Sequence, residues 1–164
     1  MYFTRNVTDV GESNALEAYW ASIVDWAQGC EAEALSCGRS LSVGEAELAD
    51  AVGVRLSGKV RLYRFTKLPE PDSPGLVAAA NLLGFKLEGT RGITFGYGIW
   101  LSGREAEEDR GLLAHELRHV AQMEWLGGLE PYLKAYLREL QRFGYPKGPL
   151  EVDAHQKGAT HGTQ

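Results

Sequence analysis

The sequence predicts an α+β fold, and three observations support that class. Helical spacing of apolar residues recurs in three long segments, 13–30, 105–126 and 130–143. Two shorter segments, 59–65 and 91–103, alternate like strands and lie between helical segments. The chain has 164 residues, 44% of them hydrophobic and 24% charged, which suits one domain with one core. We therefore expect a single domain over 1–164 in which helices pack on a small mixed sheet.

The N-terminal part of the chain is predicted to be helical. Residues 13–30 should form a long amphipathic helix. Ser42 and Glu45 fit a capping box, in which each side chain bonds the other residue's backbone amide, so a short helix should begin there and end near Gly53. This helical segment, 13–53, lies outside the core that we expect over 54–156.

The middle of the chain predicts a strand followed by a loop and a helix. Lys59–Phe65 alternates as a strand does, and "KLPEPDSPG" after it is a proline-rich loop. Leu76–Leu83 has helical composition and is followed by Gly84, which suits a helix end.

The segment "RGITFGYGIWLSG", residues 91–103, predicts one strand with unequal faces. One face carries large apolar residues, and the other carries Thr94, Gly96, Gly98 and Trp100. A face with so little side chain admits another backbone at close range. Either a helix packs across it, or an extended peptide adds there as a further strand of an exposed edge. Both readings stay open.

Helices are predicted for the rest of the chain. Ser102 and Glu105 suggest a second capping box, opening a helix that runs to about Leu126 and stops at Gly127-Gly128. A helix over 130–143 and another over 150–156 should follow, before a frayed tail at 157–164.

Composition disfavours several classes of partner. The net charge is −5 and no block of lysine and arginine could follow a phosphate backbone, so we expect no nucleic-acid partner. No apolar run is long enough for a membrane span, and the first residues lack a secretory pattern, so we expect a cytoplasmic location. Cys30 and Cys37 are expected to be buried thiols; alternatively, one thiolate could reversibly block a metal site as its fourth ligand.

The pentad from His115 to His119 is the main chemical motif. Residues four apart on a helix are separated by about 6 Å along the axis and about 40° around it. Both imidazoles can therefore reach one metal ion at about 2.0–2.1 Å. Glu116 should lie back from that ion, where it could act as a general base. The alternative is a partly exposed helix whose histidines only pack or meet solvent.

The helix around the pentad has two distinct faces. Leu113, Leu117 and Val120 share a face with Glu124 and should pack on the sheet. The histidines and Glu116 share the adjacent face, which would then turn toward a cleft. Arg118 and Gln122 should point to solvent or to the rim of that cleft.

A third ligand is expected near the C-terminus, because zinc hydrolases use three protein ligands and keep one position open for water. The candidates in "GPLEVDAHQKG" are Glu151, Asp153 and His155. Glu151 is the best of them, since it opens a helix with the small Ala154 on the same side. His155 could line the same site, whereas Asp153 faces away. The alternative is a surface helix with scattered charge.

"HELRHVAQ", followed about thirty residues later by "PLEVDA", resembles the gluzincin zinc metallopeptidases over residues 54–156. The very small members called minigluzincins, and uncharacterised bacterial domains with the same core, resemble it most. Regulators of phage repressors share the pentad and a later glutamate helix, and they cut a single protein partner. Larger gluzincins often have an acidic residue four after the ligand glutamate, where this chain has His155.

The resemblance implies a zincin-like fold, with an active-site helix beneath a small sheet and a downstream glutamate helix. It implies that His115, His119 and Glu151 bind Zn²⁺ and that Glu116 is the general base. It makes the strand with Thr94, Gly96 and Gly98 the edge that binds substrate. His155 and Tyr145 are candidates for supporting the ligands or the transition state, as are Tyr132 and Tyr136, for which core packing is the default.

The function expected from these residues is hydrolysis of peptide bonds in a peptide or protein substrate by metal-activated water. The rival is a binding module in which zinc is structural or vestigial and the protein acts through a partner. An open fourth zinc position would favour chemistry, and a fourth protein ligand would favour structure.

Overall fold

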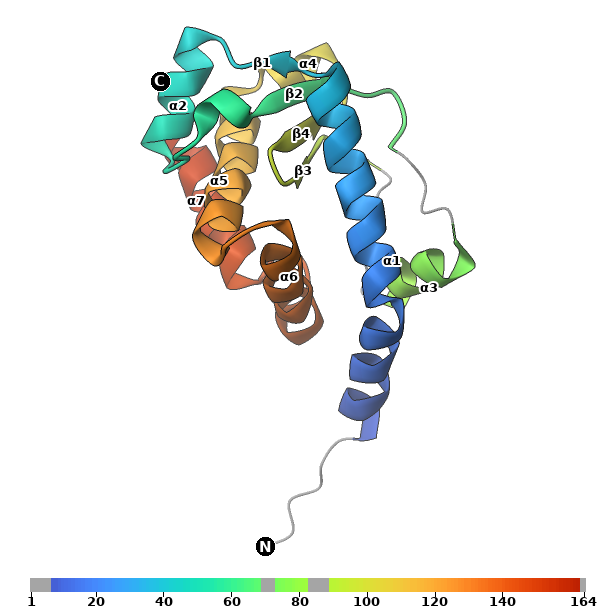
Figure 1. Cartoon of the computed structure of the whole chain (residues 1–164). Coiled ribbons are helices and arrows are strands. Elements are labelled where there is room, and N and C mark those ends of the chain that lie inside the picture. Colours follow the sequence, from blue (N-terminus) through green and yellow to red (C-terminus); the bar gives the residue numbers. More distant parts are fainter. Residues whose placement is uncertain (1–6, 69–72, 83–88, 163–164) are drawn as a thin grey trace, which may run out of the picture.

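The computed structural model describes residues 7–68, 73–82 and 89–162 (Figure 1). They form an α+β fold, as predicted, with helices α1 (Val7–Cys37), α2 (Val43–Ala51), α3 (Pro74–Leu82), α4 (Arg104–Glu108), α5 (Arg110–Leu126), α6 (Leu129–Phe143) and α7 (Pro149–His161). A short 3-10 helix, η1, spans Ser57–Lys59. The strands are β1 (Arg39–Ser40), β2 (Arg61–Arg64), β3 (Gly92–Phe95) and β4 (Gly98–Leu101). Gly84, the expected end of the helix after Leu76, lies outside the described residues.

The four strands form one mixed sheet in the order β1-β2-β4-β3. β2 runs parallel to β4, while β1 and β3 run antiparallel to their neighbours. Among the described residues β3 pairs only with β4, so β3 is an edge strand.

The prediction of one strand over 91–103 is wrong, because the segment folds back on itself as the β3–β4 hairpin. Gly96 begins the turn with a positive φ of +60°, and Tyr97 completes it without one, as in a type II′ turn. This two-residue turn reverses the parity of the side chains, so that Ile93 lies opposite Trp100 and Thr94 opposite Ile99.

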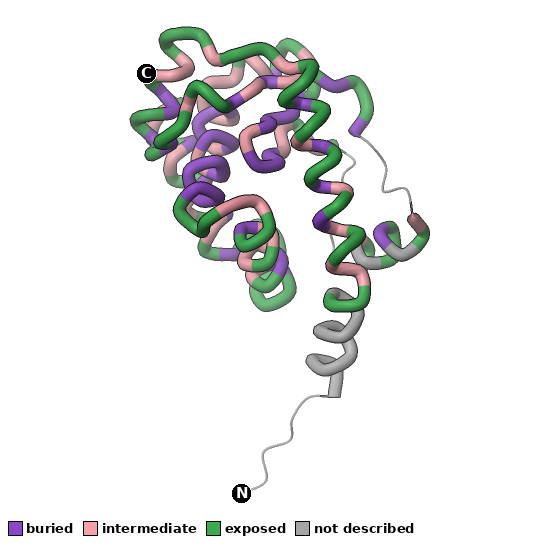
Figure 2. The backbone as a smooth tube through the Cα atoms, viewed as in Figure 1, coloured by how far each residue is buried: buried purple, intermediate pink, exposed green. Residues whose placement is uncertain are grey.

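Helices cover both faces of the sheet (Figure 1), and Figure 2 shows where the buried residues lie along the chain. Each face has its own apolar cluster. α1 covers one face, where Ala27, Cys30 and Ala34 pack with aromatic side chains of the strands. α5 covers the other face, where Leu113, Leu117 and Val120 pack with residues of β2, β4 and α2. The apolar face predicted for α5 is therefore confirmed. Glu124 on the same face accepts hydrogen bonds from the backbone amides of Arg55 and Leu56 and from the Tyr97 hydroxyl.

Local capping interactions define several helix ends, and the sequence predicted one of the two expected capping boxes correctly. The capping box of Ser42 and Glu45 is present and opens α2. The second box is wrong, since Gly103 is the N-cap of α4 and no side chain caps it. The expected helix over 105–126 is broken at Asp109, whose carboxylate accepts a hydrogen bond from the Leu112 amide and caps α5.

The C-terminal helix is longer than predicted, since α7 runs to His161 and residues 157–161 are not frayed. The cause is close packing on the start of α5: a Cβ at Gly158 would lie 2.8 Å from the carbonyl oxygen of Gly111. Arg110 also donates a hydrogen bond to the carbonyl of His161. None of the described helices combines the length and apolar composition needed to cross a bilayer.

Candidate metal centre

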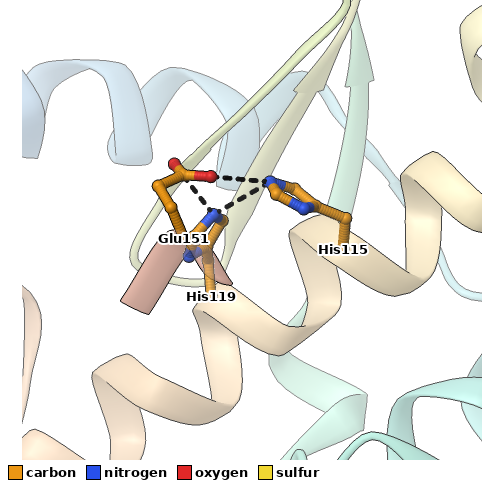
Figure 3. A group of neighbouring side chains, drawn as sticks. All are labelled: His115, His119 and Glu151. Atoms are coloured by element: carbon orange, nitrogen blue, oxygen red, sulfur yellow. Dashed lines mark hydrogen bonds and ion pairs between the residues drawn. The ribbon is translucent and has the colours of Figure 1, made fainter. Parts of the chain in front are cut away.

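Two histidines and one glutamate converge at the junction of α5 and α7 (Figure 3). His115 and His119 come from α5, and Glu151 comes from the first turn of α7. The Nε2 atoms of the two histidines lie 3.1 Å apart, and each lies 3.5 Å from one oxygen of Glu151. One ligand atom from each residue falls within 4.8 Å of the others, so the trio predicted from sequence can hold a metal ion.

Residues of α6 hold Glu151 in this position. The Tyr136 hydroxyl donates a 2.5 Å hydrogen bond to Glu151 Oε1, and Glu139 accepts a hydrogen bond from the Leu150 amide. α6 therefore fixes both the carboxylate and the backbone that carries it. Tyr136 was expected by default only to pack in the core, but its hydroxyl also positions the Glu151 carboxylate.

The remaining oxygen of Glu151 supports the fit of a cation. Oε2 is buried and accepts no hydrogen bond from any described residue. Burial opposes ionisation of this carboxyl, but His119 and the Tyr136 hydroxyl outweigh it and lower the pKa of Glu151 to about 2. A buried, ionised oxygen without a donor lacks the partner that such groups normally have, and a metal ion would supply it.

The two imidazoles differ in their affinity for protons. Burial and the neighbouring charge of His119 lower the pKa of His115 to about 4. Burial also disfavours the charged form of His119, but the carboxylates of Glu151 and Glu116 outweigh it and raise its pKa. The pair therefore accepts one proton readily and a second one poorly, as expected of two rings that share one site.

Glu116 lies against strand β3 rather than among the three ligands. Its side chain is buried, and its Oε2 accepts a 2.7 Å hydrogen bond from the Thr94 hydroxyl. Burial raises its pKa above the ordinary glutamate value. Gly92 leaves space for the carboxyl group, because a Cβ there would lie 2.7 Å from Glu116 Oε1. A buried carboxyl group with a raised pKa takes up a proton more readily than an exposed one.

Arg118 and Gln122 were predicted to point to solvent or to the rim of the cleft, and neither side chain is free in solvent. Gln122 is buried and contacts His119 Nδ1 through its side-chain oxygen at 2.9 Å. Arg118 forms an ion pair with Asp153 at 2.6 Å, and Gln122 donates to the same carboxylate. Asp153 does face away from the ligands, where it joins α7 to α5. Helical spacing gave no signal for these contacts, because the partners lie in a separate helix.

The other candidate residues surround the cluster at different depths. The His155 ring packs edge-on against His115, with centroids 4.6 Å apart, and its Nδ1 lies 2.9 Å from the Glu151 carbonyl. Tyr132 is buried, 6.1 Å from the His119 ring. Tyr145 is exposed, and its pKa is raised by partial burial and by the charges of Glu151 and Glu116. His155 thus lies beside the cluster, whereas Tyr145 is an exposed residue between α6 and α7.

The residues predicted as one substrate-binding edge are separated by the hairpin. Thr94 lies on the edge strand β3, but its side chain is buried against Glu116. Gly96 lies in the turn, where a Cβ would clash with the Glu31 carboxylate of α1. Gly98 lies on the inner strand β4, where a Cβ would lie 2.6 Å from that of Ala34. Gly96 and Gly98 therefore fit the first of the two predictions for this segment, in which a helix, here α1, packs closely across the sheet.

The cysteines do not join the metal cluster that the described residues form. Cys30 is buried as expected, but Cys37 is exposed at the end of α1. The reading that a thiolate blocks the metal site therefore has no support in this arrangement.

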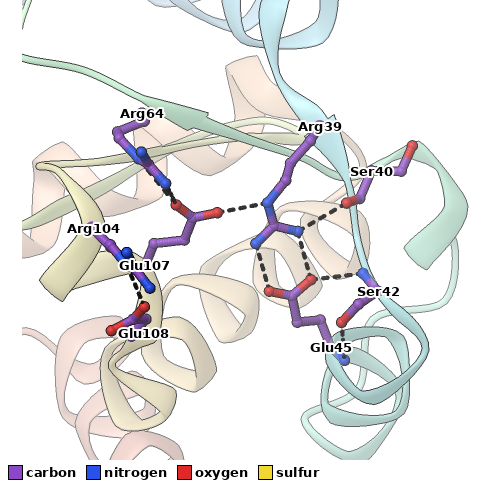
Figure 4. A network of polar contacts seen from close by, with 8 residues as sticks. All are labelled: Arg39, Ser40, Ser42, Glu45, Arg64, Arg104, Glu107 and Glu108. Carbon is purple, nitrogen blue, oxygen red and sulfur yellow. Dashed lines mark hydrogen bonds and ion pairs between the residues drawn. The ribbon is translucent and has the colours of Figure 1, made fainter.

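A separate cavity of about 500 Å³ is lined mostly by charged side chains of β1, β2, α2, α4 and the start of α5. Figure 4 shows the polar contacts among several of them. Arg39 pairs with Glu45 at 2.8 Å and with Glu107 at 2.6 Å, and Arg64 also pairs with Glu107. These charges neutralise one another, so the cluster links elements rather than presenting a free charge to a ligand.

Comparison with known proteins gives one match, which covers less than half of the chain. Residues 86–125 match the family model of the eCIS core domain. The matched segment contains the β3–β4 hairpin, α4 and the pentad, but it ends before Glu151. No curated protein and no solved structure matches the chain.

Proposed function

We propose that the protein is a zinc-dependent peptidase with a zincin-like arrangement, in which His115, His119 and Glu151 hold the metal. The observation that carries the proposal is the buried Oε2 of Glu151, which accepts no hydrogen bond from a described residue and lies 3.5 Å from Nε2 of His115, itself 3.1 Å from Nε2 of His119. Two nitrogens and one carboxylate oxygen are a ligand set that Zn²⁺ favours in catalytic sites. When bound there, zinc supplies Lewis acidity that makes water more acidic and a carbonyl more electrophilic.

In this proposal Glu116 transfers the protons and Thr94 positions Glu116. Glu116 accepts a proton from the attacking water and passes it to the leaving amine. The burial that raises its pKa makes the Glu116 carboxylate a stronger base and so favours the first of these transfers. The Thr94 hydroxyl holds this carboxyl against β3.

The substrate in this proposal is an extended peptide that adds to the edge of β3 with which no described strand pairs. An edge strand offers unpaired backbone groups that bind a peptide independently of most of its side chains. Glu116 lies directly against this strand, so a peptide paired with it would pass close to the base. His155 is exposed and packs on the His115 ring, and Tyr145 is exposed between α6 and α7, so both are candidates to contact the substrate in this proposal.

The test is the variant Glu116→Gln, measured in protein purified without a histidine tag. Zinc content by mass spectrometry should match that of the wild type, while cleavage of quenched fluorescent peptides should fall to background. Glu47→Gln is the matched control, because Glu47 is an exposed residue of α2 and the change of charge is the same. A Glu116→Gln variant that cleaves at the wild-type rate would refute the role of the base. Zinc binding without cleavage by the wild type would favour a structural metal.

A further inference from the structure

The hydrogen bonds of Gln122 determine how its side-chain amide is oriented. The residue is 1% exposed, and its amide nitrogen lies 2.9 Å from the carbonyl oxygen of Leu150. A backbone carbonyl oxygen can only accept hydrogen bonds, so the NH₂ group must face Leu150. The amide oxygen consequently faces His119, at 2.9 Å from Nδ1.

This orientation selects one tautomer of His119. An amide oxygen only accepts, so Nδ1 of His119 must carry the proton. In the neutral ring Nε2 then presents its lone pair. Nε2 is also the atom that faces His115 and Glu151, so the selected tautomer is the one that can bind a metal.

Glu151 favours the opposite tautomer of His119, in which Nε2 carries the proton. Oε1 of Glu151 lies 3.5 Å from Nε2 of His119, and a carboxylate attracts a proton to the nearest ring nitrogen. A proton on Nε2 would occupy the position that a metal ligand must keep free. An acceptor at Nδ1 opposes that outcome by stabilising the proton on the far side of the ring.

We propose that Gln122 is a positioning residue of the metal centre, which holds the His119 proton on Nδ1 and sets the placement of Glu151 through the same amide. Its NH₂ group donates to Leu150 and Asp153, which flank Glu151 in the first turn of α7. One side chain thereby couples the tautomer of one ligand to the position of another. The inference rests on the proposed metal function of the cluster, but not on hydrolysis.

The experiment measures the tautomer directly in metal-free protein. Long-range ¹H–¹⁵N spectra of histidine-labelled protein, recorded at alkaline pH where the rings are neutral, distinguish protonated from unprotonated ring nitrogens. The wild type should show a protonated Nδ1 on His119. In Gln122→Met, which keeps the chain length but removes both hydrogen-bonding groups, the proton should move to Nε2. Calorimetry with Zn²⁺ alone should show an affinity about 10–100-fold lower.

Arg118→Met is the matched control. It removes the 2.6 Å ion pair with Asp153 and so loosens α7, but it leaves the contact between Gln122 and His119. Its His119 tautomer should remain that of the wild type. Gln122→Met with Nδ1 still protonated and unchanged zinc affinity would overturn the proposal. A shift of the tautomer in Arg118→Met equal to that in Gln122→Met would overturn it as well.

Gln122→Glu keeps the proposal testable if the methionine variant does not fold. A carboxylate still accepts from Nδ1, but its second oxygen would face the Leu150 carbonyl and Asp153. The proton should therefore stay on Nδ1 while zinc affinity falls; movement of the proton to Nε2 would contradict the proposal. These measurements involve no peptide. If the protein has this His119 tautomer but cleaves no peptide, the peptidase function is refuted and the role of Gln122 is not.

Discussion

At the scale of single residues, the surroundings of Glu116 are as specific as those of the three ligands. Thr94 holds one oxygen by a hydrogen bond, and Gly92 leaves room for the other. Both residues belong to β3, so the edge strand positions the carboxyl group that the helix supplies. The position of this carboxyl can therefore be altered without any change to the metal ligands.

Gly92→Ala should displace the base and leave the metal in place. The added Cβ would lie 2.7 Å from Glu116 Oε1 and 3.1 Å from its Cδ, and the end of this flexible side chain is what must move. We expect peptide cleavage to fall by about 100-fold, as for a displacement of about 1 Å. The free energy of unfolding should fall by about 1–3 kcal/mol. Kinetics, denaturant titration and zinc content measure the three effects.

Gly58→Ala is the control for Gly92→Ala, because no atom lies within 4 Å of a Cβ added at Gly58. It should leave cleavage unchanged. Wild-type cleavage by Gly92→Ala would show that the position of Glu116 against β3 is not needed for activity.

The metal ligands could be predicted from single residues, whereas their supporting contacts could not. Two histidines four apart and a glutamate opening a later helix form a pattern within the sequence. The partners of Gln122, Leu150 and Asp153, lie 28 and 31 positions further along the chain. Nothing in the spacing on α5 indicates which residues of α7 will pack against it, so Gln122 was expected to face solvent or the rim of the cleft.

At the scale of elements, the hairpin shows why alternation alone misled. Alternation over 91–103 fits one long strand as well as two short ones, since a strand has period two whatever its length. Gly96 and Tyr97 contribute the turn, and the glycines on either side of Tyr97 obscured it. Helices with clear caps were predicted well, as α2 and the Gly127 end of α5 show.

Arg39 joins three elements through the charged cluster, linking β1 to α2 and α4. Its hydrogen bonds lower the pKa of Glu45 to about 2. A carboxyl whose pKa is lower in the folded state stabilises the protein above its unfolded pKa, and that contribution is lost as the pH falls. Here the loss should run from about pH 4.5, the ordinary glutamate value, down to about pH 2.

Arg39→Met should therefore lower the free energy of unfolding by about 1 kcal/mol at neutral pH, as for exposed ion pairs. The difference from the wild type should shrink as the pH falls from 4.5 toward 2. Urea titrations across this range measure it. Arg104→Met serves for comparison, since Arg104 forms an exposed pair with Glu108 one turn away on α4, worth about 0.3–0.5 kcal/mol. A constant difference at every pH would argue against the assigned role of Glu45.

At the scale of the whole molecule, α1 packs against the sheet as an integral part of the fold. Its residues Ala27, Cys30 and Ala34 are buried against the sheet, and Glu31 accepts a hydrogen bond from the Tyr97 amide in the hairpin turn. Trp20 also donates a hydrogen bond to Glu130 of α6. The sequence predicted this helix but gave no indication of its partner, because packing on the sheet depends on contacts far apart in the chain.

Removal of zinc should destabilise the whole molecule, because the metal would join α5 to α7. At a free zinc concentration 100 times the dissociation constant, binding adds about 2.7 kcal/mol to stability. For a chain of this length that corresponds to a midpoint roughly 5–10 °C higher than in chelator. Calorimetric scans with zinc and with chelator measure the difference. His115→Ala should show the same midpoint in both; a zinc-dependent shift in that variant would place the metal elsewhere.

The order of the ligands along the chain has a consequence for assembly. During synthesis the two imidazoles emerge with α5, followed by Tyr136 and Glu139 of α6, and Glu151 emerges last. A nascent chain that stops short of α7 thus offers a cation only two nitrogens. The trio is complete only once α7 has docked on α5, so any ion-dependent activity would appear after that helix is made.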